Sequence, residues 1–174
     1  SLRLASAALT SLHVCWCTHL RKLFLECDNL SSLYAYGCAQ LGDAAVLSTR
    51  LACLELQKCA ALDDGLLARL ALAARGAQLV LMNLTDCKAL RTPRINCARL
   101  RVLHLYNCLQ LRSLVLFCPA LNLLNLTHCI EVTQLSLVCP TLATLLCAGC
   151  KKLPDDQLVA VMQACPSLHT IDLT

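Results

Sequence analysis

The amino-acid sequence predicts an α/β fold, a right-handed leucine-rich-repeat solenoid with a parallel sheet on its inner face. The first observation is a spacing, Leu-x-x-Leu-x-Leu-x-x-Cys, which runs from Leu100 to Cys108 and again from Leu121 to Cys129, 21 residues later. The second is that cysteine returns in the same slot of further copies. A sequence period of about 20 to 29 residues indicates coils that bury their apolar faces against one another.

Short strands are predicted at every copy of this spacing. Apolar residues alternate with other residues within each copy, and repetition in register makes the strands parallel. We expect one leucine-rich-repeat domain of about eight coils over 1–174, excerpted from a longer protein because no capping unit is visible at either end. The copies start at Leu9, Leu30, Leu51, Leu79, Leu100, Leu121, Leu142 and Leu168.

The segments that return from one strand to the next are of two kinds. Those at 111–118 and 132–139 again alternate with period two, so we expect 21-residue coils that are mostly extended on the outer face. Coils of 28 and 26 residues leave room for two convex helices, which apolar spacing places at roughly 63–75 and 155–165. The alanine-rich segment 41–50 fits either a strand or one helical turn.

Acidic residues stand where both predicted helices begin. Asp63 or Asp64 can cap the first helix, and Asp155 or Asp156 the second, because a carboxylate accepts hydrogen bonds from the unpaired amides of the first turn. Gly76 is the expected end of the first helix.

Composition narrows the possible partners. The chain is 57% hydrophobic but contains no uninterrupted apolar run of the ~18 residues that a membrane span requires, so no membrane association is expected. A net charge of +4 does not by itself call for nucleic acid. We expect a monomer that binds protein and needs no cofactor.

Fifteen cysteines would suggest a disulfide framework in a small secreted protein. Here, however, most of them fall in repeating slots, where one small buried thiol per coil suits a packed interior. We therefore expect free thiols and a reducing location, the cytoplasm or the nucleus. The main slot contains Cys17, Cys38, Cys59, Cys87, Cys108, Cys129 and Cys150.

A partner-binding face is predicted where the residues between the inward leucines point outward from the inner sheet. These slots contain the only tryptophan, all three tyrosines and three of the five histidines, and polar-tipped aromatics commonly anchor protein interfaces. The competing explanation is that strands favour aromatic residues in any case. The candidate residues are His13, Trp16, Tyr34, Tyr36, Glu55, Gln57, Asn83, Thr85, His104, Tyr106, Asn125 and His128.

Two pairs within this set are expected to share a strand. Tyr34 and Tyr36 lie two residues apart, so alternation would make them face the same way. His104 and Tyr106 repeat the arrangement three coils later.

Catalysis is not expected. Cys15 or Cys53 could meet His13 or His104 only across separate coils, and no serine or cysteine stands at a sharp turn or a helix start that would activate it. We therefore predict no enzyme activity and no catalytic residue.

Neither a metal site nor a basic patch is the favoured interpretation of the remaining motifs. Cys147 and Cys150 form a C-x-x-C, but a structural zinc site requires a second close pair, so packing explains them better. The segment 88–112 contains several basic residues and no acidic residue between them. The simplest explanation is that these side chains form a solvent-exposed flank at the coil corners and on the outer half of each coil. The alternative is a patch for an acidic partner or a phosphate backbone.

One resemblance extends over essentially the whole chain. The residues from Cys150 through Leu158 to Leu168, together with Cys118 and Pro119, follow Cys-x-x-Leu-x-Asp-x-x-Leu and Cys-Pro-x-Leu. This pattern resembles the cysteine-containing repeats of F-box/LRR-repeat proteins, most closely the plant F-box/LRR-repeat protein fifteen type.

The resemblance implies the substrate-recognition repeats of an SCF-type E3 ubiquitin ligase, with a protein substrate on the inner face. Skp1 would bind only through an F-box, and no segment of this chain is similar to one. The alternatives are a stand-alone leucine-rich-repeat scaffold or regulator without a ligase role and, third, a nucleic-acid or phospho-ligand binder.

Overall fold

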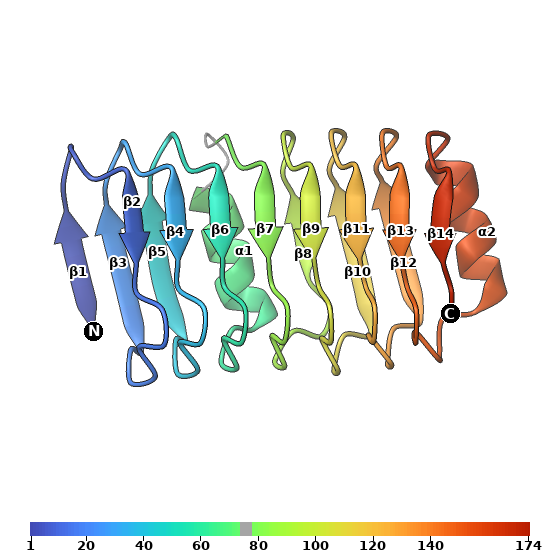
Figure 1. The fold of residues 1–174 in the computed structure, drawn as a ribbon, viewed down its shortest axis with the longest axis horizontal. Coiled ribbons are helices and arrows are strands. Elements are labelled where there is room, and N and C mark those ends of the chain that lie inside the picture. Colours follow the sequence, from blue (N-terminus) through green and yellow to red (C-terminus); the bar gives the residue numbers. More distant parts are fainter. Residues whose placement is uncertain (74–77) are drawn as a thin grey trace.

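The structure, a computed structural model, describes residues 1–73 and 78–174, without the side chains of residues 72 and 73. The chain descends through one layer and rises through the other while it advances along a single axis, which is a right-handed solenoid (Figure 1). Eight parallel strands form the layer that we call the inner sheet. They are β2 (Ser11–His13), β4 (Ser32–Tyr34), β6 (Cys53–Glu55), β7 (Leu81–Asn83), β9 (Val102–His104), β11 (Leu123–Asn125), β13 (Thr144–Leu146) and β14 (Thr170–Asp172).

The outer layer mixes strands with helices, and every return segment to which the sequence assigns a type has the expected one. Two three-stranded parallel sheets alternate with the two helices, because only the longer coils have room for a helix. The segment 41–50, which fits both a strand and a helical turn by its sequence, contains a strand. The outer elements are β1 (Leu2–Ala5), β3 (Lys22–Glu26), β5 (Asp43–Leu47), α1 (Asp64–Ala73), β8 (Arg94–Asn96), β10 (Ser113–Phe117), β12 (Gln134–Val138) and α2 (Asp155–Ala164).

The helix starts confirm one predicted cap and correct the other. The backbone N–H of Leu66 donates to Asp63 Oδ1 at 2.7 Å, so Asp63 caps α1. In α2 the N-cap is Pro154, which makes no side-chain cap, and the prediction that Asp155 or Asp156 caps the helix is wrong. Both aspartates lie inside the first turn, where their charge favours the helix dipole instead. The predicted end of the first helix, 74–75 with Gly76, lies outside the described residues.

Leucines of successive coils stack in register to form the core between the two layers. Leu33 pairs with Leu54, and Leu103 pairs with Leu124. All four of these leucines have an exposed fraction of 0 or 1%. Inward leucines and outward intervening residues therefore follow the prediction. None of the described helices is long and apolar enough to cross a membrane.

The cysteine slot has a structural reason beyond its size. Each thiol in the middle of the stack donates a hydrogen bond to a backbone carbonyl of the preceding coil, as from Cys38 Sγ to Val14 O and from Cys129 Sγ to Leu105 O, both at 3.0 Å. A buried carbonyl thereby gains a partner that a leucine could not supply. All fifteen cysteines are described, and all are free thiols in the structure.

Candidate functional site

Six of the twelve candidate residues form a single column across the inner sheet, one from each of six neighbouring strands. Register places each beside the next, so that His13 lies beside Tyr34, and Tyr34 lies beside Glu55. All are half-buried except His13, which is exposed. We call this set the strand column: His13, Tyr34, Glu55, Asn83, His104 and Asn125.

The other six candidates lie in the tight turns that follow the strands. Tyr36 and Tyr106 occupy turns two residues beyond the last residues of β4 and β9, so the expectation that each shares a strand with its neighbour is wrong. The inner strands have only three residues, and alternation stops where the chain turns the corner. Gln57 and Thr85 occupy the same turn position in their coils.

Trp16 and His128 occupy a second turn position, which adopts the left-handed conformation in every coil from the first to the seventh. Their φ angles are 59° and 62°. The backbone continues its inter-coil hydrogen bonds through this position, as from Trp16 N to Tyr36 O at 2.8 Å. These bonds offset the steric cost of φ near 60° for a residue that has a Cβ. The remaining members of this turn column are Gly37, Lys58, Asp86, Asn107 and Gly149.

Aromatic rings pair across coils at the N-terminal end of the face. His13 and Tyr34 stack with ring centroids 4.3 Å apart and an interplanar angle of 12°. Trp16 meets Tyr36 edge-on, with centroids 6.0 Å apart at 89°, and remains 59% exposed. Lys58 Nζ lies 5.5 Å from the centroid of the Trp16 ring, which is within cation–π range.

The Trp16 ring lies against Gly37 of the next coil. A Cβ added at Gly37 would be 2.5 Å from Trp16 Cε3, closer than atoms can approach. Glycine is therefore favoured at position 37 for two reasons: it leaves space for the Trp16 ring, and it adopts a φ of 73° without steric cost. The arrangement recurs between His128 and Gly149, where an added Cβ would be 2.7 Å from His128 Nδ1.

A smaller aromatic pair lies further along the face. Tyr106 and His128 meet edge-on with centroids 5.5 Å apart at 75°, and Tyr106 is 37% exposed. Beside them, Asn107 Nδ2 donates to Asp86 Oδ1 at 2.5 Å. Lys58, Asp86 and Asn107 were not among the candidates, although their common place directly before a repeat cysteine could have identified them.

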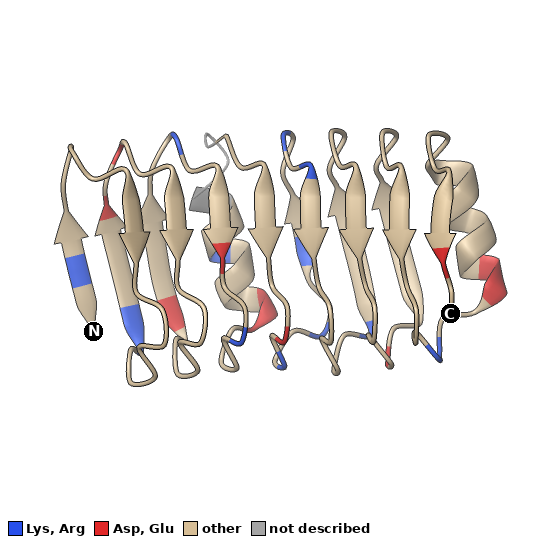
Figure 2. Ribbon diagram, viewed as in Figure 1, with Lys and Arg blue, Asp and Glu red and all other residues tan. Residues whose placement is uncertain are grey.

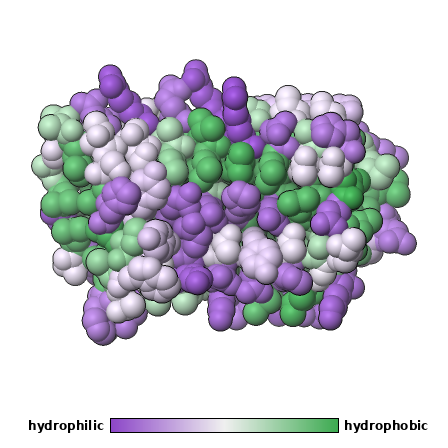
Figure 3. Space-filling view, viewed as in Figure 1, coloured by the Kyte–Doolittle hydropathy of each residue, from purple (hydrophilic) through white to green (hydrophobic). Residues whose placement is uncertain are grey.

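Polar side chains separate the two aromatic pairs. Gln57 Nε2 donates to Glu55, while Gln57 Oε1 is buried and accepts no hydrogen bond from the described residues. Asn83 Oδ1 accepts from the backbone N–H of Thr85 at 3.1 Å, and Asn125 makes the same local bond to Thr127. In Figure 3, which views the inner sheet, hydrophilic and weakly polar side chains spread across the middle of the face, beside hydrophobic patches. The surface offers both acceptors and amide donors between its rings.

The physical environment of Cys53 does not favour a nucleophile. Burial raises the pKa of this thiol, and the charge of Glu55 raises it further, outweighing the hydrogen bond from Tyr34 that lowers it. A reactive cysteine needs the opposite shift. Burial likewise raises the pKa of Cys147 to about 12. Among the residues described, no three histidine, cysteine or acidic side chains converge on a point that could hold a metal ion.

The basic stretch 88–112 divides between two opposite edges of the solenoid. Lys88 and Arg91 belong to the corner between β7 and β8, whereas Arg99 and Arg101 belong to the corner between β8 and β9. Figure 2 shows basic segments at both edges, and Arg94 lies between them on the outer strand β8. Divided in this way, the stretch does not make one continuous patch.

No protein-family model matches the chain, and no curated protein is significantly similar to it in sequence. The geometry of the inner face is therefore the main indication of function.

Proposed function

We propose that this chain is a protein-binding repeat module that holds a segment of a partner protein across its inner sheet. The observation that carries the proposal is the exposure of Trp16 and Tyr106, 59% and 37%, in aromatic pairs fixed in place by neighbouring coils. Exposed, rigid aromatics with a polar tip are typical anchors of protein interfaces. The role is binding rather than catalysis.

The distance along the face suits a short segment of protein. From β4 to β9 there are three strand steps, which correspond to about 14 Å at the usual spacing between strands. An extended peptide of four or five residues, or one face of a helix, covers that distance. Glu55 supplies a carboxylate acceptor between the anchors, and directional hydrogen bonds give the selectivity that ring contacts lack.

A more specific form of the proposal is substrate recognition for an SCF-type ubiquitin ligase in the cytoplasm or nucleus. Its support is the resemblance of the cysteine-bearing repeats to those of F-box proteins, together with fifteen thiols that are free in the structure. Skp1 would then associate through an F-box that is not part of residues 1–174. A stand-alone scaffold remains the second candidate, because the same face would serve it equally well.

Site-specific cross-linking tests the binding face. A photoreactive phenylalanine analogue replaces Tyr106 on the inner face, and in a separate variant it replaces Ser136, which is exposed on the outer strand β12. In cell extract the Tyr106 probe is expected to capture proteins that the Ser136 probe does not. Capture of the same proteins at both positions would contradict the assignment of the face.

Protein half-lives separate the ligase from the scaffold. A recognition module expressed without an F-box should occupy its substrate and protect it, so proteins captured at Tyr106 should decay more slowly when the chain is overexpressed. The Tyr34→Ala, Tyr106→Ala double variant serves as the control, since it lacks two anchors. Unchanged half-lives of the captured proteins would favour the scaffold.

A further inference from the structure

The inner face has a charge opposite to that of the chain as a whole. Its eight strands and the turns that follow them, all of which are described, contain one lysine and three acidic residues. With histidine neutral this is a net charge of −2, whereas the whole chain carries +4. The acidic residues are Glu55, Asp86 and Asp172. A negative surface attracts a basic partner and disfavours an acidic one.

The one lysine of this face, Lys58, does not neutralise its acidic residues. The side chain reaches back to the first coil, where Nζ lies 5.5 Å from the centroid of the Trp16 ring. The ion pairs that the described residues form include none to Glu55, Asp86 or Asp172. A cation for these carboxylates must therefore come from a partner.

Glu55 has hydrogen-bonding capacity to spare. Among the described residues, Gln57 Nε2 is the one donor to its carboxylate, which can accept about four hydrogen bonds. Glu55 is only half-buried, so a partner can reach it. An arginine guanidinium suits such a group, because two of its N–H groups donate in parallel to the two carboxylate oxygens.

The ring of Tyr34 lies beside this carboxylate. Tyr34 pairs with Glu55 in register on neighbouring strands, and His13 pairs with Tyr34 from the strand before. The His13 ring covers one face of the Tyr34 ring, with centroids 4.3 Å apart and planes within 12°. The opposite face of Tyr34 is therefore directed along the solenoid toward β6, and the residue is only half-buried. A guanidinium plane stacks favourably on such a face.

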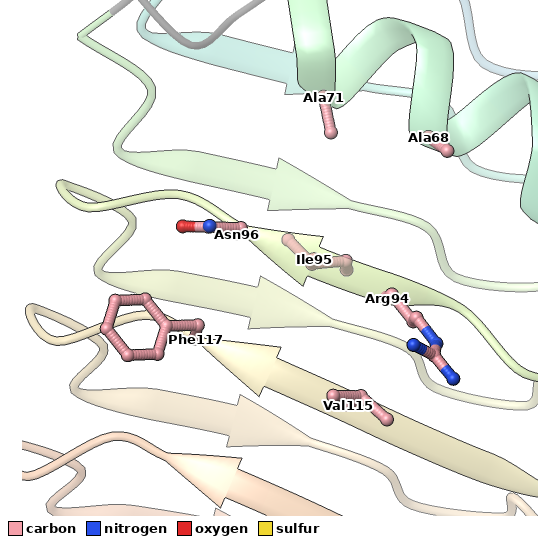
Figure 4. A pocket seen from close by; sticks show the side chains of 7 residues that line it. All are labelled: Ala68, Ala71, Arg94, Ile95, Asn96, Val115 and Phe117. Carbon is pink, nitrogen blue, oxygen red and sulfur yellow. The ribbon is translucent and has the colours of Figure 1, made fainter.

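A groove on the outer layer has the opposite charge. It has a volume of about 270 Å³ and lies between α1 and β8, and Arg94 is the only ionisable residue that lines it. Figure 4 shows Arg94 among apolar side chains of the groove, such as Val115, its register partner on β10. Because Arg94 repels a basic segment, charge favours the inner face over this groove.

We propose that the inner sheet selects an arginine of its partner, held between Tyr34 and Glu55, within a segment of net positive charge. The guanidinium stacks on the open face of the Tyr34 ring, as a third plane after His13, and donates two hydrogen bonds to the Glu55 carboxylate. Lysine fits less well, because its compact ammonium has neither the plane nor the fork. This inference rests on the proposed function, since it names the residue that the inner face recognises.

The test selects linear twelve-residue peptides from a phage-displayed library on the whole chain and then measures them as synthetic peptides. Peptides that no longer bind the Tyr34→Ala, Tyr106→Ala double variant belong to the inner face. These should carry a net positive charge and share an arginine. Replacing that arginine with lysine, or with citrulline, its neutral isostere, should weaken binding at least tenfold.

Variants of the chain locate the contact. Glu55→Gln should weaken binding at least tenfold, whereas Glu26→Gln, the charge-matched change on the exposed end of β3, should not. The losses from Glu55→Gln and from citrulline should not add, because both remove the same ion pair. Tyr34→Leu should weaken binding, while Tyr34→Phe, which keeps the ring, should not. If circular dichroism shows that Tyr34→Leu does not fold, the isosteric Glu55→Gln still decides.

The results distinguish this inference from the function proposed for the inner sheet. Inner-face peptides that lack an arginine, or additive losses from Glu55→Gln and citrulline, overturn the inference alone. A selection without binders, or peptides that bind the double variant as tightly as the unmodified chain, overturns both.

Discussion

Alkaline pH should unfold this protein through its buried thiols. Burial raises the pKa of Cys59, Cys118, Cys139 and Cys147 from 9.0 to about 12, because a thiolate in the packed core would lose its hydration. All four are at most 2% exposed. A pKa that is raised in the folded state stabilises the fold fully below pH 9 and loses that contribution as pH rises from 9 toward 12.

The expected magnitude follows from linkage. Each pH unit above 9 lowers the free energy of unfolding by up to about 1.4 kcal/mol per thiol. The four thiols together remove about 5 kcal/mol by pH 10, which is comparable with the total stability of many domains, ~5–15 kcal/mol. The fold should therefore approach its stability limit within one or two pH units above 9.

Urea unfolding followed by circular dichroism, at pH 7, 8, 9 and 10 with a reductant present, measures this loss. The unfolding midpoint should change little below pH 8 and fall steeply above pH 9. A Cys118→Ala variant starts less stable but should lose less free energy between pH 9 and 10, by about 1 kcal/mol. An equal slope in both proteins, or no slope at all, would refute the role given to the thiols.

Four further results are expected. Leu105→Ala should lower the unfolding free energy by ~2–5 kcal/mol in urea titrations, because Leu105 is fully buried. Tyr106→Ala should leave stability nearly unchanged, but it should weaken the binding of a captured partner by about 2 kcal/mol in calorimetry. The reverse pattern would show that the two side chains face the opposite way. Asp63→Ala should cost about 1 kcal/mol in the same titrations, because it removes the cap of α1, while Asp156→Ala, which removes no cap, should cost less; equal losses would contradict the cap assignment. Gly149→Ala should lower the melting temperature measurably, since its Cβ would meet the His128 ring; no change would mean that the ring moves freely. Thiol titration of denatured, unreduced protein should find nearly all fifteen cysteines reactive, and three or more stable disulfides would argue against a reducing location.

The architecture could be predicted because each coil repeats the same requirement, that its leucines point into the core. Alternating leucines specify three-residue strands, and coil length alone separates helical from extended returns, so that α1, α2, β10 and β12 lie where the sequence placed them. The second helix start shows the limit of local rules. Pro154 at the N-cap moves Asp155 into the first turn, so the preference of aspartate for caps selected the wrong residue.

The candidate site could be predicted only in part. The strand column follows from alternation, but Trp16 and Tyr36 lie beyond the ends of their strands, where alternation no longer applies. Pairings such as Lys58 with Trp16 depend on how far a side chain reaches across neighbouring coils, which spacing does not encode.

The fit of Trp16 against Gly37, and of His128 against Gly149, has a consequence for how such a chain can change. A repeat here is not an interchangeable part, since a ring in one coil requires a glycine in the next. Duplication or exchange of a single coil would separate ring from glycine, and any larger residue at the second position would displace the ring. The smallest transferable unit at these places is therefore two adjacent coils, and recombination or design that moves binding specificity between such chains should keep the coil of Trp16 with that of Gly37, and the coil of His128 with that of Gly149.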